Sequence, residues 1–267
     1  MSVGKRATLS FRLAAAAAAA SLVALSACGD DDSTSTAGGG GSSTTAQAPV
    51  IDPGDGGNYQ PQIDPNNFVD MIDNPYLPYP VGATWTYEGV EDGETENVKV
   101  MVTPERKEIM GISATVVRDT VTNGDGEVVE DTYDWFAQDR DGNVWYLGED
   151  STEFENGKAV STSGSWEAGV NGALPGIVMQ AHPEAGQAYR QEYYVGEAED
   201  LAEVDRLDAT ESVPFGDFDN LVVIKEWNPL EPDVVEEKYF APNIGTVLEV
   251  KTEGGSGRSE LTDYTPG

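Results

Sequence analysis

Apolar and polar residues alternate along most of the chain from Phe68 to Tyr264, which is the pattern of β-strands with one buried face. Clusters of glycine, asparagine and aspartate interrupt the alternation at residues 91–93, 123–126, 139–143 and 254–257. Such clusters form tight turns, and strands joined by tight turns pair antiparallel. The predicted strands cover residues 83–88, 97–102, 113–121, 127–138, 144–147, 188–195, 221–227, 234–240 and 246–252.

Two stretches carry patterns that suit a helix. Residues 67–72 are short and precede Pro75, and residues 197–207 place apolar side chains at helical spacing. The second half of residues 197–207 also fits a strand that runs to Val213, and we favour the strand there. The chain is therefore predicted to be mainly β: a single antiparallel, curved meander sheet with little helix, shaped as a half-barrel or an open barrel.

The first 27 residues have the three parts of a bacterial export signal: a positively charged start, an alanine-rich apolar run and small residues before the cut. They end in Leu25-Ser26-Ala27-Cys28, which matches the lipobox of bacterial lipoproteins. We expect Cys28 to be lipidated and to hold the mature protein on a membrane surface without spanning it. A secretory signal cut after Ser26 is the alternative, but it would leave Cys28 unexplained. The apolar run is too short and too rich in alanine for a membrane-spanning helix.

Residues 28–66 are rich in glycine, serine, threonine and proline, and they hold little that could form a core. We interpret them as a disordered tether that lifts the following domain off the membrane. The predicted organisation is a signal peptide over residues 1–27, a tether over 28–66 and a single β-rich domain over 67–267. Cys28 is the only cysteine, and a domain of this size can hold together without a disulfide.

The formal net charge of the chain is −33, and removal of the signal peptide, which has basic but no acidic residues, makes it more negative. Such a surface repels nucleic acid and anionic lipid, so nucleic-acid partners are excluded. It attracts divalent cations and cationic partners, although a solvated acidic coat is the plainer interpretation.

No catalytic constellation is recognisable. His182 is the only histidine and lies in a loop before a proline, and no Gly-x-Ser-x-Gly or phosphate-binding motif is present. A zinc site lacks ligands, because Cys28 is acylated. Among so many acidic residues, carboxylate pairs arise by chance. The most suggestive group is Glu149-Asp150 beside Trp145 and Tyr146, for which a charged strand end is the simpler account. We therefore expect no enzyme and no organic cofactor.

One turn could bind calcium. Asp139, Asp141 and Asn143 place three oxygen-bearing side chains on alternate residues of a tight turn, as hard cations require. The turn is not an EF-hand loop, because Gly142 occupies the fourth position and Asp150 the twelfth. The same residues are ordinary hairpin-turn residues, and that alternative is favoured.

Three segments resemble parts of an uncharacterised family of β-rich bacterial envelope lipoproteins. They are Asn74-Pro75-Tyr76-Leu77-Pro78 leading into Gly82-Ala83-Thr84-Trp85-Thr86-Tyr87-Glu88, then Val213-Pro214-Phe215-Gly216-Asp217-Phe218-Asp219-Asn220, and finally Tyr239-Phe240-Ala241-Pro242-Asn243-Ile244-Gly245-Thr246-Val247. The resemblance implies a curved antiparallel sheet, like the half-barrel of lipoprotein carriers. It implies no activity, since the family has no assigned function.

The sequence therefore predicts a membrane-anchored lipoprotein that faces outside the cytoplasm, at the cell surface or in the periplasm. We expect it to bind a small ligand or an envelope protein through the concave face of the sheet. One alternative is a structural or adhesive module that uses calcium. Another is a carbohydrate-binding or carbohydrate-active protein that uses exposed tryptophans, among which Trp145 and Trp166 are the candidates.

Overall fold

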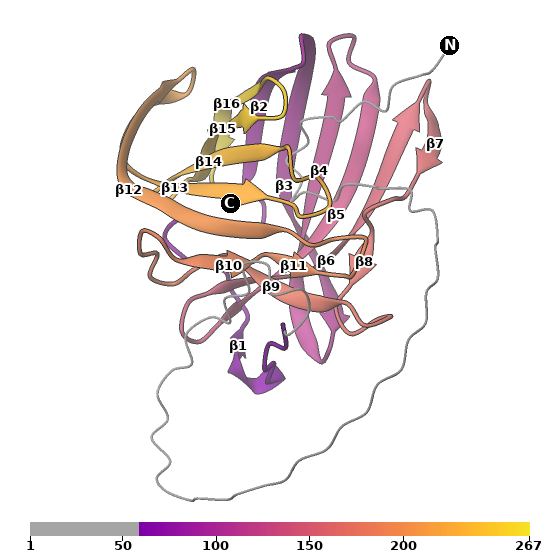
Figure 1. Cartoon of the computed structure of the whole chain (residues 1–267), viewed down its shortest axis with the longest axis vertical. Helices are drawn as coiled ribbons and strands as arrows, with labels where there is room; N and C mark the ends of the chain where they lie inside the picture. Colours follow the sequence, from indigo (N-terminus) through magenta and orange to yellow (C-terminus); the bar gives the residue numbers. More distant parts are fainter. Residues whose placement is uncertain (1–58) are drawn as a thin grey trace, which may run out of the picture.

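The computed structural model describes residues 59–267 (Figure 1). Cys28 and the predicted tether up to residue 58 lie outside this range. The described chain holds one short 3-10 helix, η1 (Pro65–Asn67), and the following strands. They are β1 (Phe68–Val69), β2 (Thr84–Glu91), β3 (Glu94–Ile109), β4 (Ile112–Asn123), β5 (Val128–Asp139), β6 (Val144–Glu155), β7 (Lys158–Ser161), β8 (Trp166–Glu167), β9 (Leu174–Met179), β10 (Ala188–Arg190), β11 (Glu192–Tyr193), β12 (Leu201–Val213), β13 (Gly216–Trp227), β14 (Val235–Ala241), β15 (Gly245–Glu253) and β16 (Gly257–Thr265). No helix between residues 59 and 267 has the length and apolar character needed to cross a membrane.

The strands form one antiparallel sheet that curves into a nearly closed barrel. Its strand order is β10-β12-β13-β14-β15-β16-β2-β3-β4-β5-β6-β9-β11, so two meanders, β2 to β6 and β12 to β16, join where β2 pairs with β16. Figure 1 shows β12 running across the long strands β3 to β6. The predicted mainly β, curved meander sheet is confirmed.

The barrel has one seam, between the two ends of this strand order. The end strands β10 and β11 are consecutive in the chain, with only Gln191 between them. A Cβ atom on Gly176 of β9 would lie 2.2 Å from the carbonyl carbon of Gln191. Glycine at this position therefore lets the backbone at the seam pack closely against β9.

Some hairpin turns contain the residue types that tight turns favour, and others do not. Asp92 and Gly93 connect β2 to β3 with φ of 48° and 89°, as a two-residue turn with two positive φ values requires. Met110 and Gly111 make a comparable connection between β3 and β4, although methionine at positive φ gives no turn signal. β3 therefore continues beyond the predicted 97–102, with a register shift around Pro104 that a proline in a strand favours.

The start of the domain differs from the prediction. Tyr59, inside the predicted tether, is 3% exposed, and its hydroxyl donates a 2.8 Å hydrogen bond to the carbonyl of Pro175. At least this residue of the segment 28–66 is therefore packed into the domain. Residues 67–72 form no α-helix: the chain passes from η1, which Asp64 caps, into β1. In residues 197–207 the strand interpretation is confirmed, because β12 begins at Leu201.

The interior of the barrel has two chemically different ends. Because neighbouring strands are antiparallel, the last parts of β2, β4, β13 and β15 and the first parts of β3, β5, β14 and β16 lie at the same end. That end, called the carboxylate end below, holds buried or half-buried ionisable side chains: Glu91, Glu96, Asp119, Glu130, Asp134, Glu226, Glu236, Lys238, Glu249 and Lys251. The opposite end, called the apolar end, is filled by core side chains that include Phe136, Phe240 and Val247 as well as Trp85 and Leu261.

Candidate functional site

Two lysines lie among the acidic side chains of the carboxylate end. Lys238 Nζ is 2.7 Å from Glu226 Oε2 and 3.8 Å from Glu249 Oε2. Lys251 forms an ion pair with Glu91. Strand register produces this grouping, since Lys238 lies opposite Glu249 on the neighbouring strand. Eight acidic side chains against two lysines leave a large excess of negative charge in a region with little water.

The excess charge is reflected in the proton affinity of the carboxyl groups. Burial raises the pKa of Asp119 and of Glu249 well above the ordinary values. Neighbouring carboxylates add to both pKa shifts, while Lys238 opposes them. Burial also raises the pKa of Glu96 and of Asp134 to about 7. Among residues 59–267, no three or more acidic, histidine or cysteine side chains are grouped so that they could hold a metal ion. With pKa values of about 7, Glu96 and Asp134 exchange protons near neutral pH.

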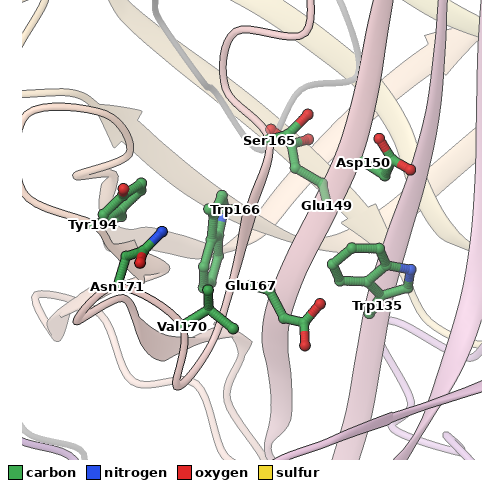
Figure 2. Close-up of a pocket in the computed structure, with 9 residues that line it drawn as sticks. All are labelled: Trp135, Glu149, Asp150, Ser165, Trp166, Glu167, Val170, Asn171 and Tyr194. Carbon is green, nitrogen blue, oxygen red and sulfur yellow. The ribbon is translucent and has the colours of Figure 1, made fainter.

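A hollow of about 270 Å³ opens beside β6, at the flank of the carboxylate end. Its lining residues are Trp135, Glu149, Asp150, Ser165, Trp166, Glu167, Val170, Asn171 and Tyr194. Figure 2 shows the indoles of Trp135 and Trp166 on either side, with the carboxylate of Glu167 between them. The hollow thus combines aromatic walls with acidic groups.

Local strand irregularities build this hollow. β5 and β6 change register between Asp134 and Phe136, and β8 pairs with β6 so that Trp166 lies opposite Glu149. Gly148 has φ of 130°, and a Cβ atom there would lie 2.2 Å from the carbonyl oxygen of Trp166. Only glycine lets β8 approach β6 closely enough to place Trp166 in the wall of the hollow.

A cation of the protein itself contacts the aromatic and acidic groups of the hollow. Lys107 Nζ lies 3.3 Å from the ring centroid of Trp135 and 2.9 Å from Glu167 Oε2. An ammonium held between an indole face and a carboxylate combines a cation–π contact with an ion pair. These side chains are therefore arranged to receive a positively charged nitrogen.

Hydrogen bonds connect the hollow with the interior. The indole of Trp166 donates to Glu192 Oε2 at 2.7 Å. The Tyr146 hydroxyl lies 2.7 Å from Asp134 Oδ1 and 3.1 Å from Glu149 Oε2. Glu149 lines the hollow, so Tyr146 links the hollow directly to a buried carboxyl group of the carboxylate end.

The predicted calcium ligands form a hydrogen-bonded turn. Asp139 accepts hydrogen bonds from the backbone and side-chain nitrogens of Asn143 and from the indole of Trp145, each 2.9 Å long. Asn143 Oδ1 accepts from the backbone nitrogen of Ala181, and Asp141 is exposed. The turn alternative accounts for these contacts, and calcium binding there stays a prediction.

The tryptophans proposed for carbohydrate binding form no exposed platform. Trp166 is 4% exposed, and Trp145 is half-buried against Phe68 with its indole nitrogen bound to Asp139. The observation that would support a carbohydrate site is therefore missing at both residues. His182 is exposed and lies outside the hollow.

Sequence reasoning found part of the hollow. It singled out Glu149-Asp150, but beside Trp145, whereas the structure places the pair beside Trp135 and Trp166. The contributions of Glu167 and Asn171 were missed, because β8 and the loop after it are too short to give a strand pattern. Tyr194 lies within the predicted strand 188–195, but its approach to β6 depends on long-range packing. Lys107 lies in the polar second half of β3, which alternation did not reveal.

Comparisons with known proteins give little further information. No protein-family model matches the chain, and no curated protein matches it. Among solved structures, the chain is similar to a "putative exported protein with YmcC-like fold" from Bacteroides fragilis, at 16% identity and a TM-score of 0.44, over 72% of this chain and 99% of that one. It is also similar to a "putative lipoprotein" from Parabacteroides distasonis, at 12% identity and a TM-score of 0.35, over the same shares. Similarities this distant establish no function, and membership of a lipoprotein family stays a prediction.

Proposed function

We propose that this protein is a non-enzymatic, lipid-anchored binding protein outside the cytoplasm, and that it binds an organic cation in the hollow beside β6. The export signal and the lipobox at Cys28 support the location. The main support for a cationic ligand is the position of Lys107, whose ammonium contacts the Trp135 ring and Glu167.

The shape and charge of the hollow favour this class over an apolar ligand. The apolar end of the barrel is filled by packed side chains, and the carboxylate end is lined by ionisable groups, which do not suit a lipid. The hollow instead has the acidic groups Glu149, Asp150 and Glu167 beside two indoles. An ammonium gains both ion-pair and cation–π energy there, whereas a neutral or anionic molecule gains neither.

Calorimetric titration of the full chain with cadaverine, a diamine that is charged at neutral pH, tests the proposal. We expect saturable binding and no binding of acetate or glucose. Glu167→Gln removes one carboxylate and should weaken binding about three- to tenfold, in line with a loss of ~1 kcal/mol. Lys107→Ala should strengthen binding, because it removes the internal cation that occupies the Trp135 face.

A matched control exists elsewhere in the chain. Lys225 Nζ lies 5.8 Å from the Trp227 ring, a lysine–tryptophan contact away from the hollow. Lys225→Ala should leave cadaverine binding unchanged. Absence of cadaverine binding, or equal effects of the substitutions at Lys107 and Lys225, would overturn the proposal.

A further inference from the structure

Three oxygen-bearing side chains connect the hollow with the interior in one row. Asp134 is 6% exposed and lies on β5, while Tyr146 and Glu149 lie on β6. The Tyr146 hydroxyl oxygen is within hydrogen-bonding distance of both carboxyl groups, at 2.7 and 3.1 Å. Tyr146 is fixed in place, because its ring stacks on Phe136 and meets the edge of Trp166.

The row needs a second proton in addition to that of the phenol. Burial raises the pKa of Tyr146 well above its usual range, so the phenol keeps its proton at neutral pH. A hydroxyl carries one hydrogen and can donate it to only one of the two carboxylates. The other carboxyl group completes the row only when it is itself protonated and donates to the phenol oxygen.

The charged groups around the row favour that extra proton. Asp119 and Glu130 face Asp134 from β4 and β5, and Glu192 faces Tyr146 from β11. Lys238 on β14 is the cation that opposes protonation, and it is already paired with Glu226. With three further carboxyl groups nearby, the row is more stable with one proton shared between Asp134 and Glu149 than with both ionised.

We infer that binding of an ammonium ion in the hollow is coupled to release of the proton that Asp134 and Glu149 share through Tyr146. This inference rests on the proposed function, since the ammonium must bind beside Glu149. The cation favours the ionised form of Glu149, the Tyr146 hydroxyl supplies the one remaining donor, and the proton leaves to solvent. Protons and the cationic ligand therefore compete, and affinity rises with pH.

Cadaverine titrations of the full chain at pH 5.5, 6.5 and 7.5 test the coupling. At each pH the titration is repeated in phosphate and in Tris, whose different ionisation heats reveal how many protons are released. We expect net proton release and an affinity that rises by at most about tenfold per pH unit for each proton released. Binding without a buffer-dependent heat and with the same affinity at all three pH values would overturn the coupling and leave the proposed function standing.

Asp134→Asn gives the sharper test. The amide cannot take up the shared proton, so cadaverine should bind with little proton release and with a flatter pH profile. Asp139→Asn is the matched control: Asp139 is a buried aspartate at the other end of β5 whose carboxylate is bound by Asn143 and Trp145 rather than by the row, and the variant should keep the wild-type proton release. Wild-type proton release in Asp134→Asn would assign the proton elsewhere and overturn the proposal. If no cadaverine binds at any pH, the proposed function itself fails. Even if a variant does not fold, the wild-type titrations show whether cadaverine binds and whether its binding releases protons.

Discussion

The two ends of the barrel interior show how one sheet can be filled in two ways. At the apolar end, side chains such as Phe136 and Leu261 are buried in direct contact with their neighbours, and burial of apolar area stabilises them at any pH. At the carboxylate end, Lys238 and its acidic neighbours are equally buried, but their stability depends on ion pairs and on bound protons. The apolar end therefore stabilises the fold at any pH, and the carboxylate end makes the stability of the fold depend on pH.

The largest loss of unfolding free energy is expected when the buried ammonium of Lys238 is removed from the carboxylate end. Lys238→Met leaves Glu226 and Glu249 without their shared ammonium, and we expect it to cost about 4 kcal/mol of unfolding free energy at pH 8, as for a broken buried ion pair. At pH 5 the cost should be smaller, because protons replace the lysine charge. Urea unfolding at both pH values measures this. Lys225→Met, a half-buried lysine on the neighbouring strand, is the control and should cost little; equal losses for both variants would contradict the comparison.

Shortening a buried side chain at the apolar end should lower the unfolding free energy by a similar amount, but the loss should not depend on pH. Leu261 is fully buried, and Leu261→Ala should cost about 3 kcal/mol through lost contacts and a residual cavity. Because no titration is involved, urea unfolding should give the same loss at pH 5 and pH 8. A loss that changes strongly with pH would show that the two ends are not independent.

The wild-type domain should be more stable in mild acid than above neutral pH. Folding raises the pKa of Glu96 from 4.5 to about 7 and that of Asp134 from 3.8 to about 7. A carboxyl group with a raised folded-state pKa contributes stability that is present at low pH and is lost as the pH rises through the folded value. We expect a loss of about 2 kcal/mol from each of these two groups between pH 5 and pH 8, measured by urea unfolding. A stability maximum near pH 8 would contradict this account of the carboxylate end.

A smaller effect of opposite sign is expected for Asp119→Asn. The Oδ1 atom of Asp119 accepts no hydrogen bond from the described residues, and burial and neighbouring carboxylates raise its pKa. On folding at pH 8, Asp119 must either take up a proton or remain charged among other carboxylates, and the isosteric amide avoids both costs. The variant should therefore be about 1 kcal/mol more stable than wild type at pH 8 and nearly unchanged at pH 5. Thermal melting at the two pH values checks this, and destabilisation at pH 8 would count against charge crowding.

The smallest effect concerns the turn at residues 139–143. Asp139 and Asn143 already make hydrogen bonds within the turn and to Ala181. We expect the melting temperature to be the same in millimolar calcium and in chelator. A clear rise with calcium that Asp141→Asn abolishes would restore the calcium hypothesis.

The alternation of residues predicted most strands of the barrel, although not β9 or β16, and it did not predict which side chains meet in the interior. The strands around 113–121 and 127–138 and their turn were predicted correctly, because period-two patterning and turn residues are local signals. Asp119 and Asp134 lie on those strands, and their positions within the strands give no sign that they are buried. Nothing local shows that strand pairing collects them with Glu249, which is more than a hundred residues away in the chain.

The sequence by itself determined most of the strand content, the glycine- and asparagine-rich hairpin turns and the acidic charge, because each depends on neighbouring residues or on composition. The export signal with Cys28 stays a prediction. Only the tertiary structure decided the pairing of β2 with β16, the seam at Gln191 and the hollow between Trp135 and Trp166. These features depend on long-range register and on the bulges that redirect side chains. They fix which charges meet in low-dielectric surroundings, and therefore which groups hold protons and which can receive a cation.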